Sequence, residues 1–304
     1  MNLPSYFEGP SLFIFSMQLL DGKMVASELY QKLQGKVAAL KEKNIHTKLV
    51  IVLVGEDPAS LSYIKQKRKA SETTGIECEL QNLKPEDVTT ESMIALVEKL
   101  NNDASVHGFI VQLPLPKHVD TPKVLKAVSP KKDVDGFTAY NLGKMFLSVE
   151  FEDLAPCTPL GVIRLLEYYK IEVRGMEVTM VGASNTVGKP LAIMLQNRGA
   201  TVTICNSKTK DLASHTKRAD LLVVAVGKAK MIGAEMVKEG AVVIDVGINR
   251  GEDGKLVGDV DFENVAPKCS FITPVPGGCG PMTVGCLMEN VVKAAERAGG
   301  EEKN

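Results

Sequence analysis

Tryptophan is absent from the 304 residues of this sequence, and the aromatic residues together make up only 5% of it. An excess of charge is absent too, because 36 lysines and arginines are balanced by 37 aspartates and glutamates, for a net charge of −1. A chain without a basic excess has no electrostatic attraction to phosphate backbones, so no nucleic-acid partner is expected. No apolar run approaches the roughly 20 residues that a membrane-spanning helix requires, so no membrane partner is expected either.

Metal-binding patterns are also missing. The six cysteines lack CxxC spacing, and the four histidines are far apart with no HExxH arrangement. Both absences argue against a zinc site, and we expect no metal. Reduced, buried thiols are the simpler interpretation of the cysteines, and they are typical of a reducing compartment such as the cytoplasm.

Residues 1–16 lack two features of a cleaved signal. Phe13, Ile14 and Phe15 form a short apolar patch, but no basic stretch precedes it and no small-residue cleavage site clearly follows. A signal peptide is therefore disfavoured. The segment that begins at Met17 resembles a natural beginning, so we interpret residues 1–16 as a dispensable extension or the product of an upstream start codon.

The chain does contain a regular alternation of amphipathic and apolar segments, with hydrophobic residues making up 44% of the total. Apolar residues at three- and four-residue spacing predict helices, and short apolar runs predict buried strands. In the first half, helices are predicted from residue 21 to 40, 60–74 and 90–101, and strands over 48–54, 76–83 and 107–113. Strands that alternate with helices are typical of a parallel sheet with right-handed crossovers.

A second alternating series follows residue 150. A linking helix is predicted over 158–170, then strands over 176–182, 200–205, 219–227 and 241–247, helices over 188–198 and 211–218, and a long last helix over 282–298. The pattern therefore predicts two α/β domains, with a last helix long enough to pack back on the first of them.

The turn after residues 176–182 has features of a dinucleotide-binding site. Gly182 ends the predicted strand, Ser184 follows, and Gly188 opens the next helix. Glycine permits a tight turn and a close approach to a pyrophosphate, and a helix N-terminus offers free N–H groups. The spacing is not GxGxxG, so a plain strand–turn–helix loop is the alternative. The interpretation as a dinucleotide-binding site rests on the strands and the helix that surround the turn.

The end of the following strand bears on which dinucleotide binds. An NAD enzyme usually places a carboxylate there for the ribose hydroxyl, and Asn206, Ser207 and Lys208 provide none. Ser207 and Lys208 are suited instead to a 2′-phosphate. The pattern favours NADP, with a solvated turn as the alternative.

Several features of the first half need a common explanation. Tyr63 and Lys67 are four residues apart, which places them on one face of a helix. Gln112 stands at the C-terminal end of a predicted strand, where open α/β sheets bind their ligands. The loop at 133–136 carries two carboxylates. Taken singly, the helix pair could be a surface pair and the loop a solvated turn.

The segment 273–283 is a loop of unusual composition. Three prolines and three glycines within eleven residues give it a rigid backbone that a ligand can approach closely. A plain turn between domains rarely needs so many residues of special conformation.

Together, these motifs resemble the bifunctional methylenetetrahydrofolate dehydrogenase/methenyltetrahydrofolate cyclohydrolases. The resemblance extends from about Leu19 to about Ala298, nearly the whole chain. It rests on seven segments in this order: SYIKQK at 62–67, VQLPLP at 111–116, KDVDG at 132–136, PCTP at 156–159, the turn at 182–190, DVGIN at 245–249, and the loop at 273–283.

The resemblance implies an activity and a domain plan. It implies oxidation of 5,10-methylenetetrahydrofolate with NADP, then hydrolysis to 10-formyltetrahydrofolate, by a cytoplasmic homodimer of one-carbon metabolism and purine biosynthesis. It also implies a parallel-sheet α/β catalytic domain for folate at 17–155 and a Rossmann-like dinucleotide-binding domain at 156–281. The helix at 282–299 is expected to pack back on the first domain.

The resemblance further implies roles for single residues. Lys67 matches the family's catalytic lysine and Gln112 the residue that assists it. Tyr63 matches the tyrosine that packs on the folate ring, and Asp135 the carboxylate that hydrogen-bonds the pterin. The folate site is expected to include these four catalytic residues and also Val111, Leu113, Pro276, Gly277, Gly278, Cys279 and Gly280. The expected cofactor contacts are Gly182, Ala183, Ser184, Ser207 and Ile248.

Three positions depart from the family pattern. Ala183 stands where members usually carry an arginine that grips the 2′-phosphate, and Asn206 stands where histidine is common. These departures leave open NAD or dual cofactor use, and a cyclohydrolase whose dehydrogenase activity is weak. Cys279 replaces the usual valine, which we interpret as a tolerated exchange of small apolar residues.

Two rival functions share parts of this pattern. An amino-acid or shikimate-type dehydrogenase has the same two-domain plan, and a non-catalytic dinucleotide sensor would also need the second domain. Neither explains why Tyr63, Lys67, Gln112 and Asp135 occur together.

Overall fold

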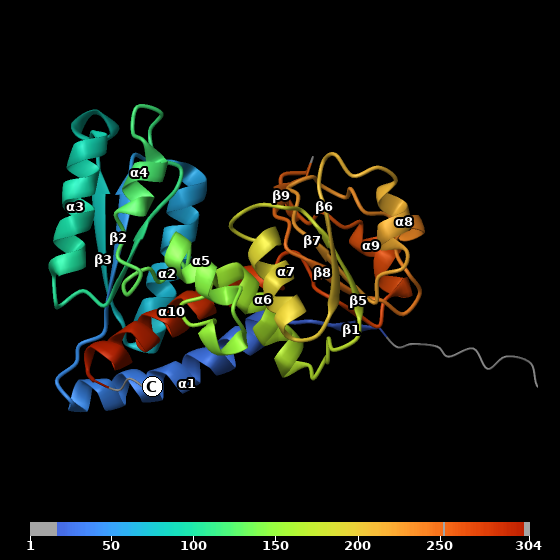
Figure 1. Ribbon diagram of the computed structural model, residues 1–304, viewed down its shortest axis with the longest axis horizontal. Coiled ribbons are helices and arrows are strands. Elements are labelled where there is room, and N and C mark those ends of the chain that lie inside the picture. Colours follow the sequence, from blue (N-terminus) through green and yellow to red (C-terminus); the bar gives the residue numbers. More distant parts are fainter. Residues whose placement is uncertain (1–16, 252, 301–304) are drawn as a thin grey trace, which may run out of the picture.

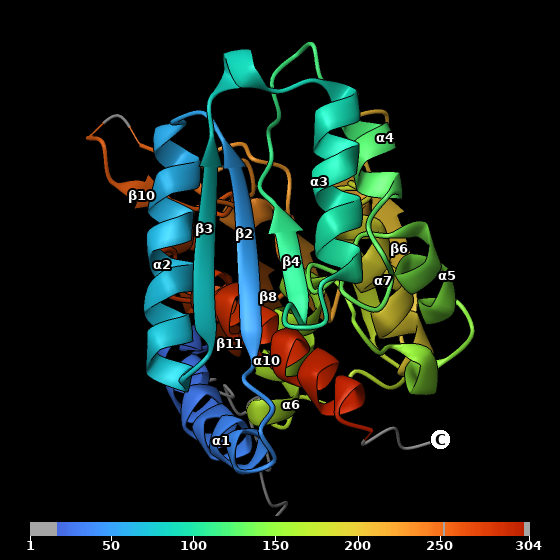
Figure 2. The ribbon, with the colours of Figure 1, turned by 90° about the vertical axis from the view of Figure 1, so that its left-hand side faces the viewer.

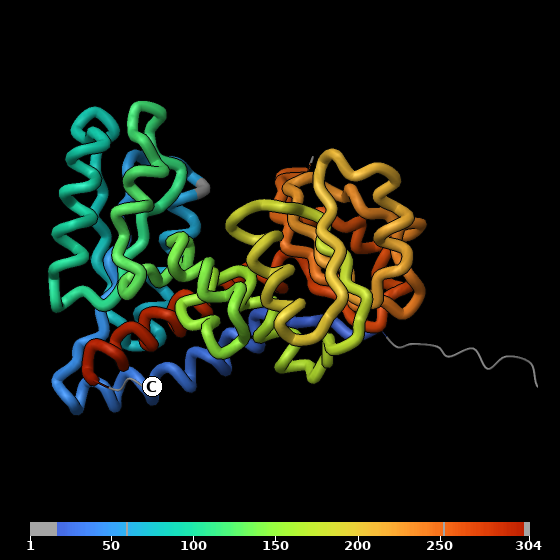
Figure 3. Tube along the Cα trace, in the orientation of Figure 1, coloured from blue at the N-terminus to red at the C-terminus, as the bar shows by residue number. Residues whose placement is uncertain are grey.

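The computed structural model describes residues 17–251 and 253–300, so the extension predicted at 1–16 lies outside the described residues. Two α/β bodies lie side by side, and long helices run along the lower edge of the first body and into the space between them (Figure 1). The chain passes between the bodies along α1 (Gly22–Glu42), along the segment that contains α5 (Ala139–Met145) and α6 (Cys157–Tyr168), and along α10 (Cys279–Ala298) (Figure 3).

The first body is built on three parallel strands in the order β3-β2-β4, seen side by side in Figure 2. Its strands and helices are β2 (Lys48–Val54), α2 (Pro58–Thr74), β3 (Glu77–Leu83), η1 (Pro85–Asp87), α3 (Thr90–Asn102), β4 (Gly108–Val111) and α4 (Thr121–Lys126). Side chains of a strand alternate between its two faces. Leu49, Ile51 and Leu53 therefore enter the core that includes residues of α1 and α10, and the valines between them enter the core that includes α3.

Local signals set the helix ends. The Asp21 carboxylate accepts hydrogen bonds from the backbone N–H groups of Lys23 and Met24, so it caps α1 as expected. Gly75 ends α2 in the left-handed conformation with φ 79°, which glycine adopts without strain. Helix α2 begins two residues before the predicted Ser60, because Pro58 suits a first turn and Asp57 caps it.

The second body contains a six-stranded parallel sheet in the order β1-β11-β8-β7-β5-β6. Its strands and helices are β5 (Glu177–Val181), α7 (Gly188–Asn197), β6 (Thr201–Cys205), α8 (Leu212–Thr216), β7 (Leu221–Val224), η3 (Ala234–Met236), β8 (Val242–Asp245), α9 (Phe262–Val265), η4 (Ala266–Lys268) and β11 (Phe271–Ile272). The strand order reverses between β5 and β7. In an open α/β sheet, ligands bind outside the carboxyl ends at such a point.

Some segments differ from the sequence prediction. Strand β1 (Gln18–Leu19), assigned to the first domain, pairs with β11 of the second sheet because Leu20 behind it is fully buried there. A short antiparallel pair, β9 (Asn249–Arg250) and β10 (Leu256–Val257), and the one-turn η2 (Val149–Phe151) were not predicted. Helix α10 begins at Cys279, inside the predicted loop, rather than at Met282.

Helix α10 packs on α1, α6 and α2 and also contacts β2 and β4, so the last helix packs back on the first body as expected. This packing and the two parallel sheets confirm the predicted fold class, while the exact domain boundary at 155/156 stays a prediction. No helix in the described part of the chain is long and apolar enough to cross a bilayer.

Candidate functional site

Lys67 lines a cavity of about 250 Å³ at the carboxyl edge of the first sheet. Tyr63 and Lys67 both line it from α2, one helical turn apart, which confirms that they share a face. Lys67 is only 7% exposed, and its Nζ donates a hydrogen bond of 3.1 Å to Oε1 of Gln112. The Gln112 amide in turn donates to the Leu113 carbonyl at 2.9 Å, so the oxygen of this amide is fixed toward Lys67.

The two carboxylates of the loop at 133–136 have different surroundings. Asp135 lines the cavity, and burial raises its pKa while the nearby charge of Lys67 opposes part of that shift. Asp133 is buried and accepts hydrogen bonds from the backbone N–H groups of Gly136, Phe137 and Thr138. Both aspartates line the cavity, and the hydrogen bonds that Asp133 accepts fold the loop.

Other residues of this cavity had no role from the sequence. Cys157 is buried at its wall, and its thiol donates to the Val134 carbonyl at 3.2 Å. The PCTP motif at 156–159 was the available signal for it. Thr283 and Leu287 line the cavity from α10, and only the packing of that helix against the first body could have revealed them.

A second cavity of about 590 Å³ adjoins the first. Tyr63 lines both cavities and stands at their junction. The predicted wall residues Pro276, Gly277, Gly278, Cys279 and Gly280 all line the second cavity, together with Ile248 and other residues of the loop after β8. The other expected folate residues line the first cavity; they are Lys67, Val111, Gln112, Leu113 and Asp135. The expected residues thus form two groups, and Tyr63 belongs to both.

The turn after β5 leaves no room for side chains at its glycines. Gly182 has φ 125°, and a Cβ there would lie 2.3 Å from the Ala225 carbonyl oxygen. A Cβ on Gly188 would lie 2.0 Å from the Gly182 oxygen. The Ser184 hydroxyl accepts hydrogen bonds from the N–H groups of Val187 and Gly188, so this side chain folds the start of α7. A close backbone approach in front of a helix N-terminus is what a pyrophosphate needs.

The segment after β6 lies next to that turn, because the Gly182 N–H donates to the Cys205 carbonyl at 2.9 Å. Asn206 shapes this segment: its Oδ1 accepts from the Lys208 N–H at 2.8 Å, and its N–H donates to the Thr209 hydroxyl. Ser207 and Lys208 are exposed. Gly182, Ala183, Ser184 and Ser207 line neither cavity, but they share the carboxyl edge of the sheet whose β8 loop carries Ile248.

Two buried carboxylates organise the loops around that edge. Asp259 accepts hydrogen bonds from the N–H groups of Val226, Gly227 and Lys228 and from the Asn249 amide. Asp245 is 3% exposed and accepts from three N–H groups of the segments at 247 and 259–260. Burial raises the pKa of Asp245 to about 6 against the lowering effect of these bonds. No sequence motif singled out Asp259.

No three histidine, cysteine, aspartate or glutamate side chains in the described ranges come together in a way that could hold a metal ion. The site instead combines a lysine, an amide and a carboxylate in one cavity with a glycine-rich turn at the carboxyl edge of a parallel sheet. These features define a dinucleotide-dependent enzyme built from two α/β domains.

Comparison with known proteins identifies the family within this class. The family model of the tetrahydrofolate dehydrogenase/cyclohydrolase catalytic domain matches residues 20–135, and the model of its NAD(P)-binding domain matches residues 156–299. The chain belongs to the tetrahydrofolate dehydrogenase/cyclohydrolase family. The expected family, fold class and enzyme class are thereby confirmed.

Individual relatives agree over nearly the whole length. The bifunctional protein FolD of Nautilia profundicola is 51% identical over 287 residues, which cover 94% of this chain and 100% of that protein. The crystal structure of the bifunctional enzyme FolD from Campylobacter jejuni has a TM-score of 0.91 at 49% identity and covers 93% of this chain and 99% of that one. The Trypanosoma brucei enzyme, solved with NADP and an inhibitor, has a TM-score of 0.87 at 33% identity over 92% of this chain and 98% of its own.

Proposed function

We propose that this chain oxidises 5,10-methylenetetrahydrofolate to 5,10-methenyltetrahydrofolate with NADP and hydrolyses that product to 10-formyltetrahydrofolate. The observation that carries the proposal is the 3.1 Å contact between Lys67 Nζ and Gln112 Oε1, in a cavity that Asp135 also lines. The Trypanosoma brucei relative binds NADP, which supports the same cofactor here. Gly182 and Gly188 allow the tight turn before a helix N-terminus that suits a pyrophosphate, which supports a dinucleotide site here.

We assign folate recognition to the cavity with Lys67 and its junction with the second cavity. In this proposal the Asp135 carboxylate accepts hydrogen bonds from a pterin, and the Tyr63 ring packs on the folate. The loop from Pro276 to Gly280 supports the opposite side of the larger cavity, and Ile248 brings the dinucleotide loop to the same space. Holding both reactants in one orientation removes much of the entropic cost of their reaction.

NADP supplies a hydride acceptor when it is bound. Oxidation leaves the folate carbon cationic, with its charge shared between two nitrogens. Water then forms a bond to that carbon and gives up a proton, and ring opening breaks one carbon–nitrogen bond while that nitrogen takes up a proton. Lys67 is the group assigned to these proton transfers, and Gln112 holds its nitrogen in place.

The test is Lys67→Ala, with Lys65→Ala as its matched control on the exposed side of α2. We expect Lys67→Ala to abolish methenyltetrahydrofolate hydrolysis while the NADP dissociation constant stays within a few-fold, because the lysine lies in the other domain. Lys65→Ala should retain both activities. Full hydrolysis by Lys67→Ala would remove the proposed role of the lysine.

A specific observation favours a second candidate, a cyclohydrolase whose dehydrogenase activity is weak or prefers NAD. Ala183 offers no cation for a 2′-phosphate at the position where the family usually carries arginine. Titrating the protein with NADP and with NAD while following methenyl-folate absorbance separates the cases. Ring opening without oxidation would indicate cyclohydrolase alone, and the absence of any turnover would favour a dinucleotide sensor.

We also propose that the chain works as a homodimer in the cytoplasm. Exposed apolar side chains gather on α5 and the segment after it, and α5 contacts α7, which packs on the edge strand β6. They are Tyr140, Phe146, Leu147, Val149 and Phe151. Sedimentation velocity should give twice the chain mass, and a monomer would contradict the dimer.

All six cysteines are unpaired, which suits a reducing compartment. Recovery of the chain from a secreted fraction would contradict cytoplasmic placement.

A further inference from the structure

Asn290 of α10 is fully buried, and its amide makes two well-formed hydrogen bonds. Its Nδ2 donates to the Val134 carbonyl at 2.9 Å and to the Ala155 carbonyl at 2.9 Å. Two carbonyl acceptors fix the orientation of the amide, because its own oxygen would repel them. That oxygen, Oδ1, has no hydrogen-bond partner among the described residues. A buried acceptor without a partner is unfavourable. We therefore attribute the presence of asparagine at position 290 to the two hydrogen bonds that its Nδ2 donates.

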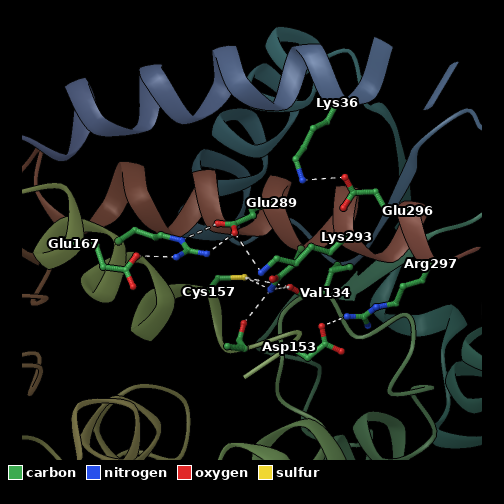
Figure 4. Close-up of polar contacts among 12 residues, drawn as sticks. Lys36, Val134, Asp153, Cys157, Glu167, Glu289, Lys293, Glu296 and Arg297 are labelled. Carbon is green, nitrogen blue, oxygen red and sulfur yellow. Dashed lines mark hydrogen bonds and ion pairs between the residues drawn. The ribbon is translucent and has the colours of Figure 1, made fainter. Parts of the chain in front are cut away.

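One carbonyl belongs to the residue before Asp135 and the other to a separate segment that packs on the same loop. Val134 directly precedes this aspartate, and the Cys157 thiol donates to the same Val134 carbonyl at 3.2 Å (Figure 4). Gly136 follows the aspartate with φ 75°, and a Cβ there would lie 2.5 Å from the Ala155 carbonyl carbon. The loop therefore lies directly on residues 155–157. The Asn290 amide connects these two backbone segments by hydrogen bonds to one carbonyl of each.

The same helix also forms the cavity wall. Leu287, three residues before Asn290, and Thr283, seven residues before it, both line the cavity of Lys67 and Asp135. Residues at this spacing share one face of a helix. The helix begins in the proline–glycine loop of the larger cavity, at Cys279. One helix thus connects the wall of the second cavity with the backbone at Val134, next to Asp135, and at Ala155.

We propose that Asn290 is a positioning residue for folate recognition, whose amide sets the place of the Asp135 carboxylate by holding the Val134 and Ala155 carbonyls. The proposal rests on the proposed role of Asp135 in binding the pterin. Asn290 touches no substrate in this arrangement and acts through the backbone alone. A residue that only stabilised the packing of α10 would have no reason to affect folate binding through Asp135.

A double-mutant cycle separates these two roles. The dissociation constant of tetrahydrofolate is measured by calorimetry for the wild type, Asn290→Ala, Asp135→Ala and the double variant. We expect Asn290→Ala to weaken tetrahydrofolate binding about tenfold in the wild-type background and less than about twofold when Asp135 is already alanine. The NADP dissociation constant should change less than about twofold throughout. An equal loss in both backgrounds would overturn the proposal.

Asn197→Ala is the matched control, since its amide also bridges two acceptors, the Met145 carbonyl and Glu152, at a distance from Asp135. It should leave the tetrahydrofolate constant unchanged. If Asn290→Ala does not fold, Asn290→Ser is carried through the same cycle, with the same outcomes deciding. An unchanged constant in Asp135→Ala would show that the proposed folate site is wrong. A weakened constant in Asp135→Ala with none in Asn290→Ala would overturn only the positioning role.

Discussion

Asp133 and Asp135 have the same side chain two positions apart, yet their surroundings assign them different tasks. Both line the cavity, but Asp133 accepts hydrogen bonds from three backbone N–H groups and the Asn141 amide, whereas Asp135 lies near the charge of Lys67. The sequence motif predicted that carboxylates matter here, and family resemblance selected Asp135. Alternation along the chain could not distinguish them, because both positions lie in a loop where side-chain direction follows no period.

Ala183 provides a prediction at the same scale. We expect Ala183→Arg to strengthen NADP binding by about 1–3 kcal/mol, because a guanidinium pairs with a phosphate through two charge-assisted hydrogen bonds. The measurement is the NADP dissociation constant, with NAD affinity compared in parallel. Ala183→Met, which adds length without charge, should give no such gain. An unchanged NADP affinity in the arginine variant would place the 2′-phosphate elsewhere.

The Asp245 carboxylate should make the free energy of unfolding depend on pH. Burial raises its pKa from 3.8 to about 6, so the folded chain holds this proton more tightly than the unfolded chain. Its contribution to stability is therefore fully present below pH 3.8 and is lost as the pH rises through about 6. Relative to Asp245→Asn, the wild type should lose up to about 3 kcal/mol of unfolding free energy between roughly pH 4 and pH 7.

Urea unfolding of both proteins across this pH range checks the expectation. The asparagine variant carries a constant offset from altered hydrogen bonds, so the slope against pH is the quantity to compare. A difference that does not change with pH would mean that Asp245 titrates alike in the folded and unfolded chains.

At the scale of elements, sequence signals worked best where they act over one or two turns. Asp21 caps the start of α1 and Gly75 the end of α2 as predicted, since capping depends only on residues that are neighbours in the sequence. Strand β1 was missed because its partner, β11, lies about 250 residues further along the chain. The place of Leu287 in the site likewise depends on how α10 packs, which no local pattern in the sequence contains.

The contact of α6 with α10 includes a partly buried ion pair (Figure 4). Arg164 reaches Glu289 at 2.7 Å, and Lys293 adds a second contact at 3.2 Å. Burial by itself would raise the pKa of Glu289, but the bonds from Arg164 and Lys293 outweigh it and lower the pKa. A lowered folded pKa stabilises the fold above the unfolded value of 4.5, and this contribution is lost as the pH falls through the folded pKa.

We therefore expect Glu289→Gln to reduce the free energy of unfolding by about 1–3 kcal/mol near neutral pH, and by less in acid. Glu167→Gln is the control, because Glu167 bonds the same arginine but is 48% exposed, and an exposed pair contributes about 0.5 kcal/mol or less. Denaturant titrations compare the three proteins. Equal losses in both variants would show that burial of the pair is immaterial.

At the scale of the whole molecule, the two bodies share one core. A single cluster of buried side chains contains Leu49 and Ile51 of β2, Val178 and Met180 of β5, and Met288 of α10. Strand β1 belongs to the second sheet, while α1, which begins three residues after it, packs on the first body. These connections make independent unfolding of either sheet costly.

Calorimetry with NADP examines this coupling. At about 100 times the dissociation constant, ligand binding stabilises the folded state by about 2.7 kcal/mol. We expect one heat-absorption peak that shifts as a whole to higher temperature. NADP bound to the second domain should also stabilise the first domain, because the two share one core. Two peaks, of which only one moves, would show that the domains unfold separately.

The pairing of β1 with β11 also has a consequence for synthesis on the ribosome. A nascent chain that ends before Phe271 contains β1 but not the strand beside which it lies. Residues 18–19 must therefore remain outside the exit tunnel without their partner until residues 271–272 have emerged. The edge of the dinucleotide sheet is completed only then.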